Sequence, residues 1–213
     1  MTQSQQSVRM VLVFAILTLA TGPAQAQSTR VVPAPLLTSI LANPQPAATA
    51  GDVRGDVTIV EYFDYDCPVC RHLEPELRKL LASDAKVRLI RKDWPVFGEA
   101  SEYAAYCSYA AAREGRYAAA NDALILSHRD LDSKEDVRGV LRGAGFNIQQ
   151  LDADIQSHAK EYSDRLKRSR GETAALGLQG TPGLIVGDEM VLGGVDSAGL
   201  AKLVRSARQA NQK

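Results

Sequence analysis

Hydrophobic and polar residues alternate over residues 57–63, which is the pattern of a β-strand with two distinct faces. One face would carry Ile59, Glu61 and Phe63, so a carboxylate stands in an otherwise apolar strand. Two interpretations of Glu61 stay open. It lies at an edge of the sheet and reaches water, or it is buried with a raised pKa that suits it to exchange protons with a nearby group.

An amphipathic helix is predicted to follow this strand, from about Cys67 to Leu81. Pro75 removes one backbone N–H from that helix and should kink it. A second strand is predicted over residues 87–92 and ends before Trp94 and Pro95. The apolar stripe of the helix would consist of Leu73, Leu77, Leu80 and Leu81.

The middle of the chain has helical periodicity, with glycine at the expected breaks. Residues 99–128 are rich in alanine and are interrupted at Gly115. Ser133 and Asp136 have the spacing of a capping box, and a further helix is predicted from Asn147 to about Leu176. The sheet resumes as a hairpin over residues 183–192 that turns at Gly187-Asp188, before a last helix capped by Asp196 or Ser197.

The N-terminus carries the features of a secretory signal peptide. Arg9 is followed by an apolar run that is too short to span a bilayer, and Ala24-Gln25-Ala26 forms the cleavage signal. We expect residues 1–26 to be removed after Ala26; a retained membrane anchor is the alternative. Residues 27–52, which are broken by prolines, are expected to form an arm that docks on the body or on another copy.

Charge and cysteine content narrow the function classes. The chain has 25 basic and 25 acidic residues, so its charge balance gives no case for a nucleic acid or an anionic membrane as partner. Three cysteines are too few for a disulfide-stapled scaffold, and two of them form the motif Cys67-Pro68-Val69-Cys70. In an exported chain, this pair is expected to be the working part.

The position of Cys67 predicts redox chemistry. It stands where a strand ends and a helix begins, and the free N–H groups and positive dipole end of that helix favour a thiolate over a thiol. A cysteine in such a position can have a pKa of roughly 3.5–7.5. Because Cys70 lies one helical turn further on, the two sulfurs can close into a disulfide.

The order of these features resembles the thioredoxin fold, an α/β fold with a mixed sheet. With a helical block between its halves, the chain is similar to the DsbA-like thiol-disulfide oxidoreductases, and residues 61–71 and 92–98 look most like the ScsC/Com1-type branch. Pro75 and Thr181-Pro182 stand in the matching places. The resemblance implies a thioredoxin-like domain formed by residues 53–98 and 179–213, with residues 99–178 as a helical insertion.

The resemblance also implies a division of labour within the motif. Cys67 would be the exposed nucleophile that forms a mixed disulfide with a client protein. Cys70, partly buried, would resolve that disulfide, and Pro68 and Val69 would tune the thiolate.

Three further positions gain a role from the resemblance. The peptide bond between Thr181 and Pro182 would be cis, and its backbone would offer an edge for a client chain. Glu61 would be the buried acid beneath the cysteine pair. Its partner would be Lys92, with the adjacent Arg91 as the alternative because the register is not fixed.

A metal site is the competing interpretation of the same motif. Cys67, Cys70 and His72 could furnish three ligands for Cu(I) or Zn(II), as in a metal chaperone. Cys107 is interpreted as a buried apolar residue, with a regulatory thiol as the alternative. The remaining candidates are interpreted as surface groups: His128, His158 and an acidic rim of Asp64, Asp66, Glu74 and Glu76.

Together these features predict an exported thiol-disulfide oxidoreductase that acts on cysteines of periplasmic proteins without an organic cofactor or a metal. A membrane redox partner would regenerate its active state. We expect a monomer that binds no nucleic acid, with self-association through the arm left open. The direction of exchange, oxidase or isomerase/reductase, also stays open, although Val69 lacks the polar character that would make a strong oxidant.

Overall fold

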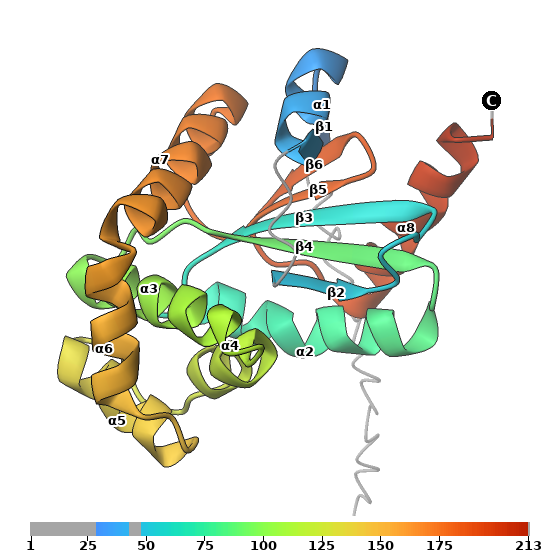
Figure 1. Cartoon of the computed structure of the whole chain (residues 1–213). Coiled ribbons are helices and arrows are strands. Elements are labelled where there is room, and N and C mark those ends of the chain that lie inside the picture. The colour runs from blue at the N-terminus through green and yellow to red at the C-terminus, as the bar shows by residue number, and fades with distance from the viewer. Residues whose placement is uncertain (1–28, 43–47, 213) are drawn as a thin grey trace, which may run out of the picture.

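The computed structural model describes residues 29–42 and 48–212 (Figure 1). Within them a six-stranded mixed sheet has the order β1-β6-β5-β3-β4-β2. Strand β3 pairs in parallel with β4 and antiparallel with β5, so it lies inside the sheet. The strands are β1 (Thr29–Val31), β2 (Thr49–Gly51), β3 (Val57–Phe63), β4 (Val87–Asp93), β5 (Gly183–Val186) and β6 (Glu189–Leu192).

Eight helices accompany the sheet in the described part of the chain. Helices α3 to α7 lie between β4 and β5 in the sequence and form a block beyond one end of the sheet (Figure 1). The helices are α1 (Ala34–Ala42), α2 (Pro68–Ser83), α3 (Glu99–Arg113), α4 (Tyr117–Ile125), α5 (Lys134–Gly143), α6 (Ile148–Ser157), α7 (Ala159–Leu176) and α8 (Ser197–Ala210).

Each face of the sheet has its own hydrophobic core, because side chains alternate along every strand. Ile59 of β3 packs with leucines of α2 and α8 on one face. Val60 and Tyr62 of β3 pack on the other face with Ile40 of α1 and Leu176 of α7. A third cluster fills the helical block and includes both Cys67 and Cys70. The cysteine pair therefore lies where the helical block meets the sheet.

Most of the predicted elements are confirmed. Strand β3 has the predicted bounds, and the capping box of Ser133 and Asp136 is present at the start of α5. The helix predicted over residues 147–176 is instead two helices, which break at His158. Leu81 lies half-buried at the side of the predicted stripe. Pro75 lies inside α2, and the kink stays a prediction.

The N-terminal segment is more closely integrated than the predicted arm. Strand β1 pairs with β6 and β2 pairs with β4, so this segment forms both edges of the sheet. Neither strand was predicted from the sequence. The predicted signal peptide, residues 1–26, lies outside the described residues. Among those described, no helix is both apolar and long enough to cross a bilayer.

Candidate active site

Cys67 occupies the N-cap position of α2, directly after the β3–α2 loop. The backbone N–H of Cys70 donates to its Sγ at 3.4 Å, and Pro68 stands in the first turn, where its missing N–H costs no helical hydrogen bond. The pKa of Cys67 is lowered to about 6, chiefly by a hydrogen bond from the Cys70 thiol, with Thr181 and backbone N–H groups adding to the effect. Burial opposes this shift without reversing it. At neutral pH the thiolate therefore predominates.

The predicted exposure of Cys67 is wrong: the residue is only 2% exposed. Its Sγ lies 3.4 Å from the carbonyl oxygen of Thr181, more than a hundred residues away in the sequence. That loop covers the sulfur, whereas Val69 between the two cysteines is 43% exposed. The Pro68-Val69 turn is therefore the most accessible part of the motif.

The covering loop contains a cis peptide bond between Thr181 and Pro182. Its backbone is held by a hydrogen bond from Gly193 N–H to the carbonyl oxygen of Pro182, at 2.9 Å. The hydroxyl of Thr181 is buried. The loop thus presents main-chain groups beside the Cys67 sulfur.

Cys70 is more deeply buried than predicted, with no exposed surface. Burial raises its pKa well above the usual value, and the hydrogen bond to Cys67 and the charge of Glu61 add to the shift. All three cysteines of the chain are free thiols in this structure. The two sulfurs of the motif therefore differ sharply: one ionises readily, and the other keeps its proton unless a base takes it.

Glu61 is the nearest candidate for that base. It is 2% exposed on the interior strand β3, so the interpretation as a water-exposed edge residue is wrong. Burial raises its pKa to about 8, although the positive charge of Arg91 opposes the shift. Its Oε2 has no hydrogen-bond partner. A carboxyl group of this pKa can accept or return a proton near neutral pH.

The partner of Glu61 is Arg91, and the prediction of Lys92 is wrong. In the parallel pairing of β3 with β4, Glu61 stands opposite Arg91, whose Nε lies 3.6 Å from Glu61 Oε2. Lys92 points to the other face of the sheet, where its Nζ donates to Glu172 at 2.8 Å and to the carbonyl oxygen of Ile40 at 3.1 Å.

The predicted acidic rim is wrong for Asp64 and Glu74, which are both buried. Glu74 accepts two hydrogen bonds from Arg91 Nη2, at 2.9 and 2.8 Å. Asp64 accepts the backbone N–H groups of Val96 and Phe97, at 2.7 and 3.1 Å, and so ties the loop before Cys67 to the β4–α3 loop. Asp66 and Glu76, also assigned to the rim, are half-buried.

Arg71, directly after Cys70, has a structural role that the sequence reasoning missed. Its guanidinium donates to the carbonyl oxygens of Tyr65 and Arg129, both at 2.8 Å, and to Asp66 at 3.2 Å. It therefore fastens the loop after α4 to the loop that presents Cys67. The sequence signal that could have indicated this role is the position of Arg71 directly after Cys70.

Comparison with known proteins identifies the family. A family model described as thioredoxin matches residues 44–206, more than half of the chain. The chain belongs to the thioredoxin family. A crystal structure of a thioredoxin-like oxidoreductase from Silicibacter pomeroyi is 36% identical, with a TM-score of 0.73, over 78% of this chain and 94% of that one. The thiol-disulfide exchange protein α-DsbA2 from Wolbachia pipientis is 27% identical, with a TM-score of 0.69, over 76% of this chain and 87% of that one.

Two other similarities say less about the function of this chain. The catalytic domain of Proteus mirabilis ScsC is 21% identical, with a TM-score of 0.64, over 82% of this chain and 98% of that one, which shows the fold alone. A curated relative, an Na⁺/H⁺ antiporter from Salinispora tropica, is 32% identical over 54% of this chain. The chain spans only 17% of that antiporter and about a quarter of others.

These comparisons confirm the predicted thioredoxin fold, the DsbA-like resemblance and the enzyme class of disulfide oxidoreductase. In this thioredoxin-family chain, the structure brings Cys67, Cys70, Glu61 and the Thr181-Pro182 loop together.

The metal-site interpretation receives no support from this family member's geometry. His72 is exposed, and its Nδ1 lies 2.7 Å from the carbonyl oxygen of Pro68. Among residues 29–42 and 48–212, no three His, Cys, Asp or Glu side chains are grouped so that they could hold a metal ion.

Cys107 is fully buried with a pKa raised to about 12 by burial, which confirms its interpretation as an apolar residue. His128 is exposed, whereas His158 is half-buried.

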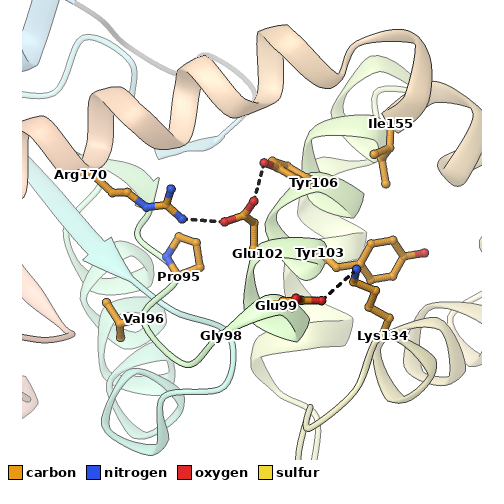
Figure 2. A pocket seen from close by; sticks show the side chains of 10 residues that line it. All are labelled: Pro95, Val96, Gly98, Glu99, Glu102, Tyr103, Tyr106, Lys134, Ile155 and Arg170. Atoms are coloured by element: carbon orange, nitrogen blue, oxygen red, sulfur yellow. Dashed lines mark hydrogen bonds and ion pairs between the residues drawn. The ribbon is translucent and has the colours of Figure 1, made fainter.

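A cavity of about 700 Å³ lies in the helical block, beside the β4–α3 loop. Figure 2 shows Arg170 and Tyr106 directed at the carboxylate of Glu102, with hydrogen bonds of 2.6 and 2.7 Å. Val96, whose backbone N–H is bound by Asp64, is also part of the lining. The cavity is therefore linked through the β4–α3 loop to the loop that carries Cys67.

Proposed function

We propose that this chain catalyses thiol-disulfide exchange with the cysteines of exported proteins through the Cys67–Cys70 pair. The observation that carries the proposal is the contrast between the two sulfurs. The pKa of Cys67 is about 6, whereas that of the buried Cys70 is raised above its usual value. Because the thiolate is the nucleophile, Cys67 attacks a client disulfide, or receives attack when the pair is oxidised.

The second step belongs to Cys70. Once Cys67 is joined to a client, Cys70 must lose its proton before it can attack the Cys67 sulfur and release the client thiolate. Glu61 would be the base that accepts this proton. Its charge acts on the Cys70 thiol, and its own pKa is raised to about 8. Pro68 and Val69 set the geometry of the turn between the sulfurs.

Clients would bind along an apolar rim, which we define as Val69, Val96, Phe97 and Leu192. All four side chains are exposed, and exposed apolar patches commonly mark binding sites. Two sets of contacts near the Cys67 sulfur support this choice of surface. The loop after β6 approaches Val69 at Gly194, and Asp64 binds the backbone of Val96 and Phe97. A client segment would pair with the backbone of Thr181 and continue towards the cavity beyond Val96.

Export supplies the setting for this chemistry. A signal peptide over residues 1–26 would send the chain to the periplasm, where disulfides persist. A membrane redox partner would then restore the active state after each turnover. We expect the chain to work as a monomer, since β1 and β2 bind to its own sheet.

Trapping tests the proposal. Cys70→Ser should accumulate mixed disulfides with cysteine-containing exported proteins, visible as bands that a reducing agent removes, because the client can no longer be displaced. Cys67→Ser should form none and lose insulin reduction, and Cys107→Ser is the matched control with normal turnover. Equal, mild losses in both motif variants would contradict the division of labour.

A redox titration of the Cys67–Cys70 pair decides the direction of disulfide exchange. A potential near that of strong oxidants indicates an oxidase, and a lower potential indicates a reductase or isomerase.

A further inference from the structure

A second buried carboxyl group, that of Asp93, lies close to the active site and has no part in the exchange steps above. Asp93 ends strand β4 and is 1% exposed. Its carboxylate interacts with the hydroxyl of Tyr109 but forms no hydrogen bond of normal geometry. A buried acid held this weakly carries a high free-energy cost when it is charged, so its presence calls for a physical reason.

The sheet places Asp93 on the same side as the active-site acid. Asp93 stands two residues after Arg91 on β4, and its partner on β3 is Phe63, two residues after Glu61. Because side chains alternate along a strand, the side chains of Glu61 and Asp93 leave the same face of the sheet. At this spacing the negative charge of Asp93 adds to the rise in the pKa of Glu61.

The surroundings of Asp93 are polar but incompletely bonded. The hydroxyls of Tyr109 and Tyr117 are buried beside it; that of Tyr109 interacts with the Asp93 carboxylate and that of Tyr117 with the hydroxyl of Tyr65. The pKa of Asp93 itself is raised to about 7 by burial. The ionisable groups that interact with this acid come from five parts of the fold: Glu61 of β3, Asp64 and Tyr65 of the following loop, Tyr109 of α3, Tyr117 of α4 and Arg165 of α7.

We infer that Asp93 is a second proton-carrying carboxyl group of this site, which shares with Glu61 the proton that Cys70 gives up and takes back. Since it acts through Glu61, it is a positioning residue rather than a catalytic one. The inference rests on the proposed function for its chemistry. Two acids that interact strongly lose their protons in two separate steps, so over an intermediate pH range the pair holds one proton between them.

The Cys70 thiol transfers its proton to the Glu61 carboxylate, and the Asp93 carboxylate takes that proton from Glu61. The Cys70 thiolate then attacks the Cys67 sulfur, the Cys67–client disulfide breaks, and the client leaves as a thiolate. In the reverse direction, the proton returns from Asp93 through Glu61 to Cys70.

A coloured leaving thiol makes the Cys70 step measurable. Cys67 of the full chain is joined to an aromatic thiol, and its release is followed against pH in the wild type and in Asp93→Asn. Loss of the neighbouring negative charge should lower the pKa of Glu61. The pH at which the release rate is half-maximal should therefore fall by about one unit. The pKa of Cys67, read from thiolate absorbance, should stay unchanged. Asp132→Asn, an exposed acid, is the matched control.

An infrared titration tests the shared proton separately. The carbonyl stretch of protonated carboxyl groups should lose intensity near neutral pH in Asp93→Asn, and Glu61→Gln should lower the pKa of the band that remains. An unchanged rate midpoint in Asp93→Asn overturns the inference. So does an unshifted Asp93 band in Glu61→Gln, which keeps the test valid if Asp93→Asn does not fold. A wild type that forms no mixed disulfide contradicts the proposed function instead.

Discussion

Arg91 lies 3.6 Å from Glu61 through its Nε but forms no hydrogen bond with that carboxylate. The guanidinium instead donates both of its Nη2 hydrogen bonds to Glu74, at 2.9 and 2.8 Å. Arg91 thus neutralises Glu74 and attracts Glu61 only partly. Because the compensation is partial, burial prevails and the pKa of Glu61 rises to about 8. An acid tied fully to its cation would be a much weaker base.

Removing this guanidinium should affect both stability and chemistry. Arg91→Met leaves the buried Glu61 without its cation and the buried Glu74 with Arg78 alone, and breaking a buried pair costs about 3–5 kcal/mol. The same change should raise the pKa of Glu61 further and move the midpoint of the Cys70 step to higher pH. Urea denaturation and the coloured-thiol assay measure the two effects.

Lys92→Met is the matched control for that variant. It removes a cation from the next residue of β4 and leaves Glu172 without its ion pair, on the opposite face of the sheet. We expect a loss of stability but an unchanged midpoint for the Cys70 step. A midpoint shift of equal size in both variants would show that the pH profile reports general destabilisation rather than the charge beside Glu61.

Stability should depend on pH through Glu61. Its pKa rises from 4.5 to about 8 on folding, so the penalty for ionising it is absent below the lower value and complete above the higher one. Glu61→Gln removes that penalty. The variant should therefore gain stability over the wild type as pH rises, by at most about 3 kcal/mol at neutral pH. Urea denaturation of the reduced proteins at several pH values measures this, and a gain that shrinks with rising pH would contradict it.

The acidity of Cys67 should depend on Cys70. The thiolate absorbance of the reduced protein should titrate with a midpoint near 6, because the Cys70 thiol donates to Cys67. In Cys70→Ala this largest stabilising contact is lost, so the midpoint should rise towards the usual value of about 8.5. Cys107→Ala should leave it unchanged. A midpoint unaffected in Cys70→Ala would assign the effect to the helix N-terminus alone.

Local sequence patterns were sufficient for the elements that carry the site. The alternation in β3, the leucine stripe of α2 and the Ser133 capping box are each readable within a few residues. Strands β1 and β2 were missed because each has three residues and no alternation. Their conformation is set by pairing with β6 and β4, which lie far along the chain.

The errors at the site have the same origin. Whether Arg91 or Lys92 faces Glu61 depends on the register of two strands, and a shift of one residue exchanges the two faces. The burial of Cys67 depends on the loop at Thr181, which no local pattern places beside it. The predicted strand over residues 87–92 stops short of Asp93, whose burial among other ionisable groups is visible only in three dimensions.

The N-terminal segment offers a last test, since it was expected to be a docked arm. Ile40 of α1 has no exposed surface and packs with Val60 and Tyr62, and the carbonyl oxygen of Ile40 accepts a hydrogen bond from Lys92. Ile40→Ala should therefore destabilise the whole fold by about 2–5 kcal/mol, as expected for a core cavity. A single, cooperative urea transition shifted to lower concentration would support this. If the variant melted α1 alone and left the main transition in place, the segment would be an independent arm after all.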